Sequence, residues 1–170
     1  MRKILLLAVL VLVAVPAAFA EDSPSPATPN TLCKQQRVAI GMAAFKLLYG
    51  SNNAYGKCVS KAATAATANT TNAAKLCAAE RASATFAAEH GGKTFAQFYG
   101  TGTHGNNAFG KCVSSKAQTL QQEQQQATIN AAKTCKAERT AMGAGPFTTK
   151  YGGHANAFGK CVSKTAKANP

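Results

Sequence analysis

Apolar side chains along residues 33–49 recur at the spacing of an α-helix. Four of them fall at positions i, i+4, i+7 and i+11 of one helix face: Val38, Met42, Phe45 and Tyr49. Gly50 follows directly and is expected to end this helix, because glycine readily adopts the backbone conformation found just past a helix C-terminus. The pattern therefore predicts a helix that buries the face on which these four side chains lie.

Three short motifs each occur three times along the chain. The first is Cys-x3-Arg, beginning at Cys33, Cys77 and Cys135. The second is Phe-x3-Tyr-Gly, beginning at Phe45, Phe95 and Phe147. The third is Asn-Ala-Phe/Tyr-Gly-Lys-Cys-Val-Ser, at residues 53–60, 107–114 and 156–163. The order and spacing predict three tandem copies, which we call repeat 1 (32–71), repeat 2 (72–128, with an insertion that contains Gly91-Gly92) and repeat 3 (129–170).

The third motif suits the start of a helix. Asparagine is a good N-cap residue, and one opens each copy: Asn53, Asn107 and Asn156. Within the motif, Phe109, Cys112 and Val113 share one helix face, and Lys111 lies on another. The motif also keeps a glycine, which lowers helix propensity and predicts close packing of a backbone or ring against it: Gly56, Gly110 and Gly159. In repeat 3, Pro146 is expected at the first position of a separate short helix.

The connections between repeats contain neither glycine nor proline. Residues 57–90 and 111–142 are each compatible with one long helix shared by two repeats. Helices above 30 residues are unusual in small domains, and Asn69-Thr70-Thr71-Asn72 offers a break and a new cap, so a break is expected there. The second connection is a better helix former, and the sequence leaves its continuity open.

The N-terminal residues indicate export. Arg2 and Lys3 precede an apolar run, and Ala18-Phe19-Ala20 matches a signal-peptidase site, so residues 1–20 are predicted to be a signal peptide removed after Ala20. A membrane anchor is the alternative, but the run is shorter than the ~20 residues that span a bilayer. Residues 21–31 contain three prolines and are expected to form an extended, flexible spacer.

Six cysteines in an exported chain predict disulfides rather than a metal or catalytic site. Fifteen pairings are possible, and because each repeat owns two cysteines, pairing within repeats is expected: Cys33–Cys58, Cys77–Cys112 and Cys135–Cys161. The rival scheme joins neighbouring repeats through Cys58–Cys77 and Cys112–Cys135. A metal site is not supported, because the sequence has no Cys-x-x-Cys and no histidine at ligand spacing from two cysteines.

The chain of 170 residues carries 19 Lys and Arg against 6 Asp and Glu, a net charge of +13. One lysine recurs identically in the third motif of every repeat: Lys57, Lys111 and Lys160. If the repeats stack, these lysines would form a ridge that binds an anionic polymer such as a wall polymer, a polysaccharide or a nucleic acid without sequence specificity. A basic surface that only keeps the protein in solution is the alternative.

The sequence contains no recognisable catalytic motif. Gly-x-Ser-x-Gly, His-Glu-x-x-His and a phosphate-binding glycine loop are all absent, and no cofactor is expected. Glu80 and Glu138 occupy matching positions, but repeat 1 has Gln36 there, so a structural polar role is favoured over a catalytic one. Asn69-Thr70-Thr71 matches a glycosylation acceptor.

These motifs, over residues 33–164, resemble repeats of small exported bacterial proteins without an assigned activity; the resemblance implies a bacterial exported protein and no particular fold or site. We therefore expect an all-α protein of three disulfide-stapled helical repeats, each built as helix, short helix or loop, and helix. The expected function is that of an exported, non-enzymatic basic protein. The alternatives are a cell-wall or polysaccharide-acting enzyme, or a secreted inhibitor or toxin-like module. The oligomeric state is left open.

Overall fold

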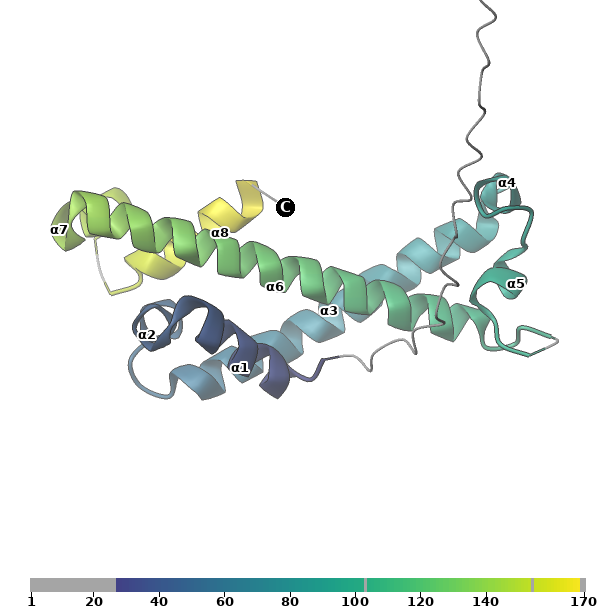
Figure 1. Ribbon diagram of the computed structural model, residues 1–170, viewed down its shortest axis with the longest axis horizontal. Helices are drawn as coiled ribbons and strands as arrows, with labels where there is room; N and C mark the ends of the chain where they lie inside the picture. The colour runs from purple at the N-terminus through teal and green to yellow at the C-terminus, as the bar shows by residue number, and fades with distance from the viewer. Residues whose placement is uncertain (1–26, 103, 154, 169–170) are drawn as a thin grey trace, which may run out of the picture.

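The computed structural model describes residues 27–102, 104–153 and 155–168, and within these residues the chain forms helices and no strand (Figure 1). The helices are α1 (Pro29–Ile40), α2 (Met42–Tyr49), α3 (Ala54–Ala82), α4 (Phe86–Glu89), α5 (Phe95–Tyr99), α6 (Ala108–Met142), α7 (Ala144–Lys150) and α8 (Ala157–Ala168). The expected all-α fold is confirmed. In the described part, every helix is too short or too polar to cross a membrane.

The expected signal peptide and residues 21–26 of the expected spacer lie outside the described residues. The end of that spacer is helical, because Pro29 stands at the first position of α1 and the Thr28 hydroxyl accepts a hydrogen bond from the Thr31 amide. Proline is favoured at this position, where its missing N–H has no partner to lose. The fold therefore begins at Thr28, a few residues earlier than the composition of the spacer predicts.

Both connections between repeats are continuous helices. α3 has 29 residues and α6 has 35, so the expected break at residues 69–72 is wrong. The hydroxyls of Thr70 and Thr71 donate to the carbonyls of Ala66 and Thr67, which satisfies them inside the helix. Asn69 is buried and donates from Nδ2 to Gln124 Oε1 of α6 at 3.3 Å, so a tertiary contact replaces the capping role that its sequence suggests.

α3 and α6 run antiparallel and pack against each other as the spine of the molecule (Figure 1). Because each is shared by two repeats, the chain passes from one end of the spine to the other and back. Repeats 1 and 3 meet at one end, where α2 and α7 pack against α8. Repeat 2, with α4 and α5, forms the opposite end (Figure 1). The repeats therefore do not stack in a row.

Two hydrophobic clusters match this division. The larger one joins repeats 1 and 3 and includes Ile40, Phe45, Phe147 and Phe158. The smaller one belongs to repeat 2 and is built around Phe86, Phe95 and the Cys77–Cys112 disulfide. A small domain with little apolar core commonly depends on disulfides for stability, and repeat 2 is the case to which this applies most.

The predicted disulfides are confirmed. Cys33–Cys58, Cys77–Cys112 and Cys135–Cys161 each close a loop within one repeat, over 25, 35 and 26 residues. The continuous helices also exclude the rival pairing. Cys58 and Cys77 lie nineteen residues apart on α3, which corresponds to about 28 Å, far beyond the reach of a disulfide.

The apolar stripe predicted for residues 33–49 is only half right. Gly41 has φ +81° and separates α1 from α2, so the segment is not one helix. Phe45 is buried as expected, whereas Val38 is 81% exposed and Met42 is 50% exposed. In repeat 3, Pro146 stands at the third position of α7 rather than the first, because Gly143 ends α6 and α7 starts directly after it.

Candidate functional site

Each repeat contains the same polar contact beside its disulfide. The tyrosine of the second motif donates a hydrogen bond to the side chain three residues after the first cysteine. The pairs are Tyr49 with Gln36 Oε1 at 2.7 Å, Tyr99 with Glu80 Oε2 at 2.9 Å, and Tyr151 with Glu138 Oε2 at 2.9 Å. The same oxygens lie 3.5, 3.9 and 4.0 Å from the Sγ of Cys58, Cys112 and Cys161. A disulfide sulfur carries no proton, so these sulfur contacts are packing contacts.

The two glutamates of this arrangement also form ion pairs. Lys116 Nζ lies 2.6 Å from Glu80 Oε1, and Lys150 Nζ lies 2.7 Å from Glu138 Oε1. Burial raises the pKa of Glu80, but hydrogen bonds from Lys116 and Tyr99 outweigh it, so its pKa lies below the ordinary value. The hydrogen bonds from Lys150 and Tyr151 lower the pKa of Glu138. Both carboxylates are held in the charged form, which suits a structural role better than proton transfer near neutral pH.

The tyrosines are held in their protonated, hydrogen-bond-donating form. Burial raises the pKa of Tyr49, and burial together with the nearby carboxylates raises the pKa of Tyr99 and Tyr151. The position occupied by Gln36, Glu80 and Glu138 was noticed in the sequence, but its tyrosine partner was missed. The available signal was the fixed offset of three residues from the first cysteine, combined with an oxygen acceptor at that position in every repeat.

The three recurring lysines do not lie together. Lys57 and Lys160 stand in the first turns of α3 and α8, at the end where repeats 1 and 3 meet, and Lys111 stands at the start of α6, at the other end. All three are exposed. Their arrangement excludes the single ridge expected for stacked repeats, although it leaves each of them accessible to a ligand.

Two of these lysines lie against the ends of neighbouring helices. A Cβ built at Gly50 would lie 3.0 Å from Lys57 Nζ, and one at Gly152 would lie 2.8 Å from Lys160 Nζ. Both glycines have φ near +91° and follow the ends of α2 and α7. The ammonium groups therefore lie against helix C-termini, where a cation interacts favourably with the helix dipole.

The folding of the chain concentrates positive charge at one end. Residues 30–71 contain five Lys and Arg and no acidic residue, and residues 129–170 contain seven and one, so repeats 1 and 3 carry eleven net positive charges. Residues 72–128 contain five and three, so repeat 2 carries two. Because repeats 1 and 3 share one end of the spine, that end is strongly basic and the other is nearly neutral.

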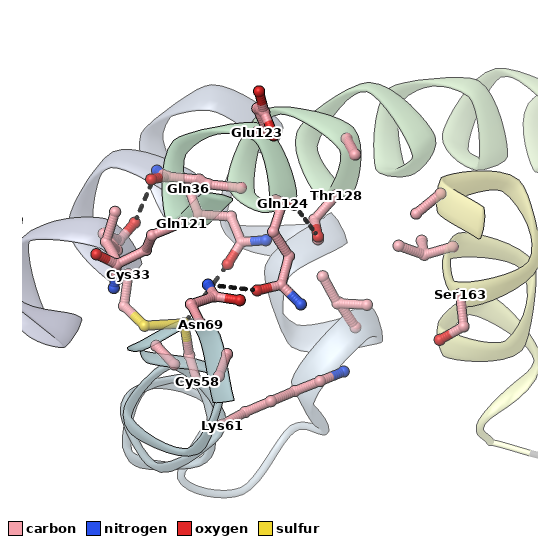
Figure 2. Close-up of a pocket in the computed structure, with 18 of the residues that line it drawn as sticks. Cys33, Gln36, Cys58, Lys61, Asn69, Gln121, Glu123, Gln124, Thr128 and Ser163 are labelled. Atoms are coloured by element: carbon pink, nitrogen blue, oxygen red, sulfur yellow. Dashed lines mark hydrogen bonds between the residues drawn. A yellow bond between two sulfur atoms is a disulfide. The ribbon is translucent and has the colours of Figure 1, made fainter. Parts of the chain in front are cut away.

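A groove lies between α1, α3, α6 and α8, with a volume of about 490 Å³ (Figure 2). This volume is in the range typical of small-ligand sites. Side-chain amides dominate its polar lining, and we call it the amide groove: Gln36, Asn69, Gln121, Gln124 and Gln125. Leu32, Leu48 and Val162 contribute apolar surface, and Lys61 and Lys167 contribute positive charge. This groove could not be predicted from the sequence, because its lining comes from all three repeats and from segments far apart in the chain.

Asn69 belongs to this groove, which bears on the predicted glycosylation acceptor. Its side chain is 9% exposed, and its Nδ2, the atom to which a glycan would be joined, donates to Gln124. The folded protein therefore presents Asn69 as a groove residue rather than as an accessible acceptor. Among the residues that the structure describes, no group of three or more His, Cys, Asp or Glu is placed to hold a metal ion.

These features define an all-α basic protein in which three disulfides staple three helical repeats around two shared helices. Comparison with protein-family models, with curated proteins and with solved structures finds no match. The three disulfides fit a protein that folds in an oxidising compartment.

Proposed function

We propose that this protein is an exported, non-enzymatic protein that binds an anionic polymer of the cell envelope or the extracellular space through the basic end formed by repeats 1 and 3. The observation that carries the proposal is the gathering of eleven net positive charges at that end by the two shared helices. A surface of one sign raises the local concentration of an oppositely charged polymer and speeds its association.

The composition of the basic end indicates how specific such binding is. Beyond residue 20 the chain has 14 lysines and three arginines. Lysine acts as a mobile point charge, whereas arginine forms the bidentate contacts that recognise phosphate or carboxylate geometry. The described residues contain ion pairs at Lys116 and Lys150, and most other cations lie at the surface. We therefore propose binding that depends on charge density and weakens steeply with salt.

Export is part of the proposal and rests on two separate features. Residues 1–20 have the composition of a signal peptide with a cleavage site after Ala20. The three disulfides require an oxidising compartment to persist. Together they support a secreted or periplasmic protein, and intact-mass measurement of the exported chain, with Glu21 as the expected N-terminus, tests this part.

The binding test compares two triple variants that remove equal charge. The first variant changes three exposed lysines of repeats 1 and 3 to Gln: Lys34, Lys133 and Lys136. The second variant changes three exposed lysines of repeat 2 to Gln: Lys75, Lys93 and Lys111. Affinity for polyphosphate and for polygalacturonate is measured against salt concentration. The first variant is expected to lower the slope of log K against log salt by ~2–3, through loss of counterion release, and the second by less than half of that.

Two results would contradict the proposal. Equal losses in both variants would mean that net charge alone attracts the polymer, and the basic end would not be a site. Shortening of either polymer during prolonged incubation would instead favour an enzyme. Helix content and the three disulfides are checked in every variant, so that a folding defect is not mistaken for a loss of binding.

A further inference from the structure

The amide groove has the chemistry of a site for one uncharged amide group. We infer that it binds the acetamido substituent of an amino-sugar unit, which names the class of polymer that the basic end recognises and to that extent rests on the proposed function. The inference depends on how the amides of α3 and α6 are paired, on the apolar surface beside them, and on the cations at the groove's edge.

The pairing of Asn69 with Gln124 leaves a matched donor and acceptor facing the groove. Asn69 Nδ2 donates to Gln124 Oε1 at 3.3 Å, which turns the Asn69 carbonyl oxygen and the Gln124 amide nitrogen toward the open space between α3 and α8 (Figure 2). A secondary amide offers the complementary set, since its N–H donates to Asn69 and its carbonyl accepts from Gln124. Asn69 is nine-tenths buried, and a hydrogen bond formed in such partly dry surroundings is stronger than one in bulk water.

Two of the other amides of the groove, those of Gln125 and Gln36, form hydrogen bonds within the protein. Gln125 Nε2 donates to the Leu32 carbonyl and to Gln35 Oε1, both at 3.3 Å. Gln36 Oε1 accepts from Tyr49. A peptide backbone presents an amide group about every 3.3 Å and needs a series of partners. One matched pair suits a single pendant amide better, such as an acetamido group on a sugar ring.

Small apolar side chains also line the groove and provide apolar surface for a methyl group. Ala62 and Ala65 line the groove from α3, and Val162 and Ala166 line it from α8. Burying one methyl group against such side chains stabilises a complex by about 0.8 kcal/mol. An acetamido group combines this methyl with the N–H and carbonyl, so one substituent uses both kinds of surface.

Charged side chains at the edge of the groove extend the match to an acidic sugar. Lys61 lies eight residues before Asn69 on α3, about 12 Å along the helix axis, and Lys167 lines the groove from α8. The carboxylate that lines the groove, Glu123, points away from Lys61 (Figure 2). An acidic group on the neighbouring sugar unit would therefore meet Lys61 or Lys167 rather than Glu123.

The experiment uses two uncharged tetrasaccharides that differ only in the substituent of interest. The disulfide-bonded protein, labelled with ¹⁵N, is titrated with the β-1,4 tetramer of N-acetylglucosamine and with the β-1,4 tetramer of glucose. The first is expected to shift the side-chain amide signals of Asn69 and Gln124 in a saturable way, and the second to leave them in place. Equal shifts from both sugars, or none from either, would overturn the inference. A blocked tetra-alanine peptide that binds more tightly than the acetamido sugar would overturn it as well, in favour of a peptide groove.

A pair of variants on one helix supplies the matched control. Gln124→Ala removes the proposed donor and is expected to weaken binding of the acetamido tetramer roughly 3- to 10-fold, the loss of one hydrogen bond. Gln122→Ala, equally exposed on α6 but outside the groove, is expected to change nothing. Equal weakening by both variants would contradict the assignment of Gln124. Because the probes are uncharged and the lysine variants leave the amide pair intact, failure of this inference and failure of polymer binding at the basic end give different results.

Discussion

The recurring glycine of the third motif has a different neighbour in different repeats. A Cβ at Gly56 would lie 2.5 Å from Asn53 Oδ1, and one at Gly159 would lie 2.7 Å from Asn156 Oδ1. These asparagines stand directly before α3 and α8, and Asn53 Oδ1 accepts a hydrogen bond from the Gly56 amide. In repeats 1 and 3 the glycine therefore makes room for the asparagine side chain. The predicted close approach of another backbone is found at Gly159, where a Cβ would lie 3.7 Å from the Leu48 carbonyl oxygen, and not at Gly56.

Repeat 2 lacks this constraint, which gives a matched pair of substitutions. Asn107 bonds to Thr101 instead of capping α6 with its side chain, and a Cβ at Gly110 would meet no atom within 4 Å. Gly110→Ala is therefore expected to stabilise the protein by about 0.5–1 kcal/mol, the gain in helix propensity. Gly56→Ala is expected to displace the cap, which costs about 1 kcal/mol and cancels or reverses that gain. Urea unfolding of both variants measures this, and equal stabilisation would show that the cap contributes nothing.

The hydrogen bonds to Glu80 and Glu138 predict a dependence of stability on pH. Their pKa values are lowered on folding, so the stability that they contribute is complete above 4.5, the ordinary value for glutamate, and is lost as pH falls through the folded-state values. Glu80→Gln with Glu138→Gln keeps an acceptor for the tyrosines, as Gln36 already provides in repeat 1. The double variant is expected to lose less thermal stability between pH 7 and pH 3 than the parent. An identical loss would mean that other groups govern acid unfolding.

At the scale of single residues, a contact could be predicted from the sequence only where the alignment of the three repeats reveals both of its residues. The disulfide pairing followed from two cysteines in each of three copies. The bond from Tyr99 to Glu80 spans nineteen residues, and a contact at that separation has no local signal until both residues are aligned across the repeats. The exposure of Val38 and Met42 was missed because Gly41, with its positive φ, ends the helix on which their helical spacing depends.

At the scale of elements, the continuity of α3 is the feature that most changes the fold. Ala68 is exposed and lies next to the residues where a break was expected, so substitutions there test the backbone with little effect on packing. Ala68→Gly is expected to cost about 1 kcal/mol and Ala68→Pro about 3 kcal/mol or more, as in a helix interior. Unfolding by denaturant measures both. If neither variant changed the free energy of unfolding, α3 would not be continuous at Ala68, and the break expected at residues 69–72 would be supported.

The break was expected because Asn and Thr favour caps and turns when only local sequence is considered. In the structure, the hydroxyl and amide groups of these residues form hydrogen bonds that the local sequence does not predict. Thr70 donates to a carbonyl of its own helix, and Asn69 bonds across to α6. The second partner exists only once α3 and α6 lie side by side, so tertiary structure decides the continuity of the helix.

At the scale of the whole molecule, the long helices decide where the charge and the groove are found. Composition predicts a basic protein, and the repeats predict which segments are most basic. Neither predicts that repeats 1 and 3 meet, since a row of stacked repeats would have kept them apart. The amide groove depends on the same arrangement, because it needs α1 from repeat 1 and α8 from repeat 3 on either side of the shared helices. The site could not be predicted before the path of the chain was known.

The sharing of α3 and α6 also makes the position of each copy depend on whether its number is odd or even. Each shared helix carries the chain across the full length of the spine, so consecutive copies always fall at opposite ends. A fourth copy joined by another such helix would extend from α8 and lie beside repeat 2, and a fifth would return to repeats 1 and 3. Lengthening the chain would then thicken the molecule at both ends rather than extend it, and substitutions in odd-numbered copies would alter one end while those in even-numbered copies altered the other.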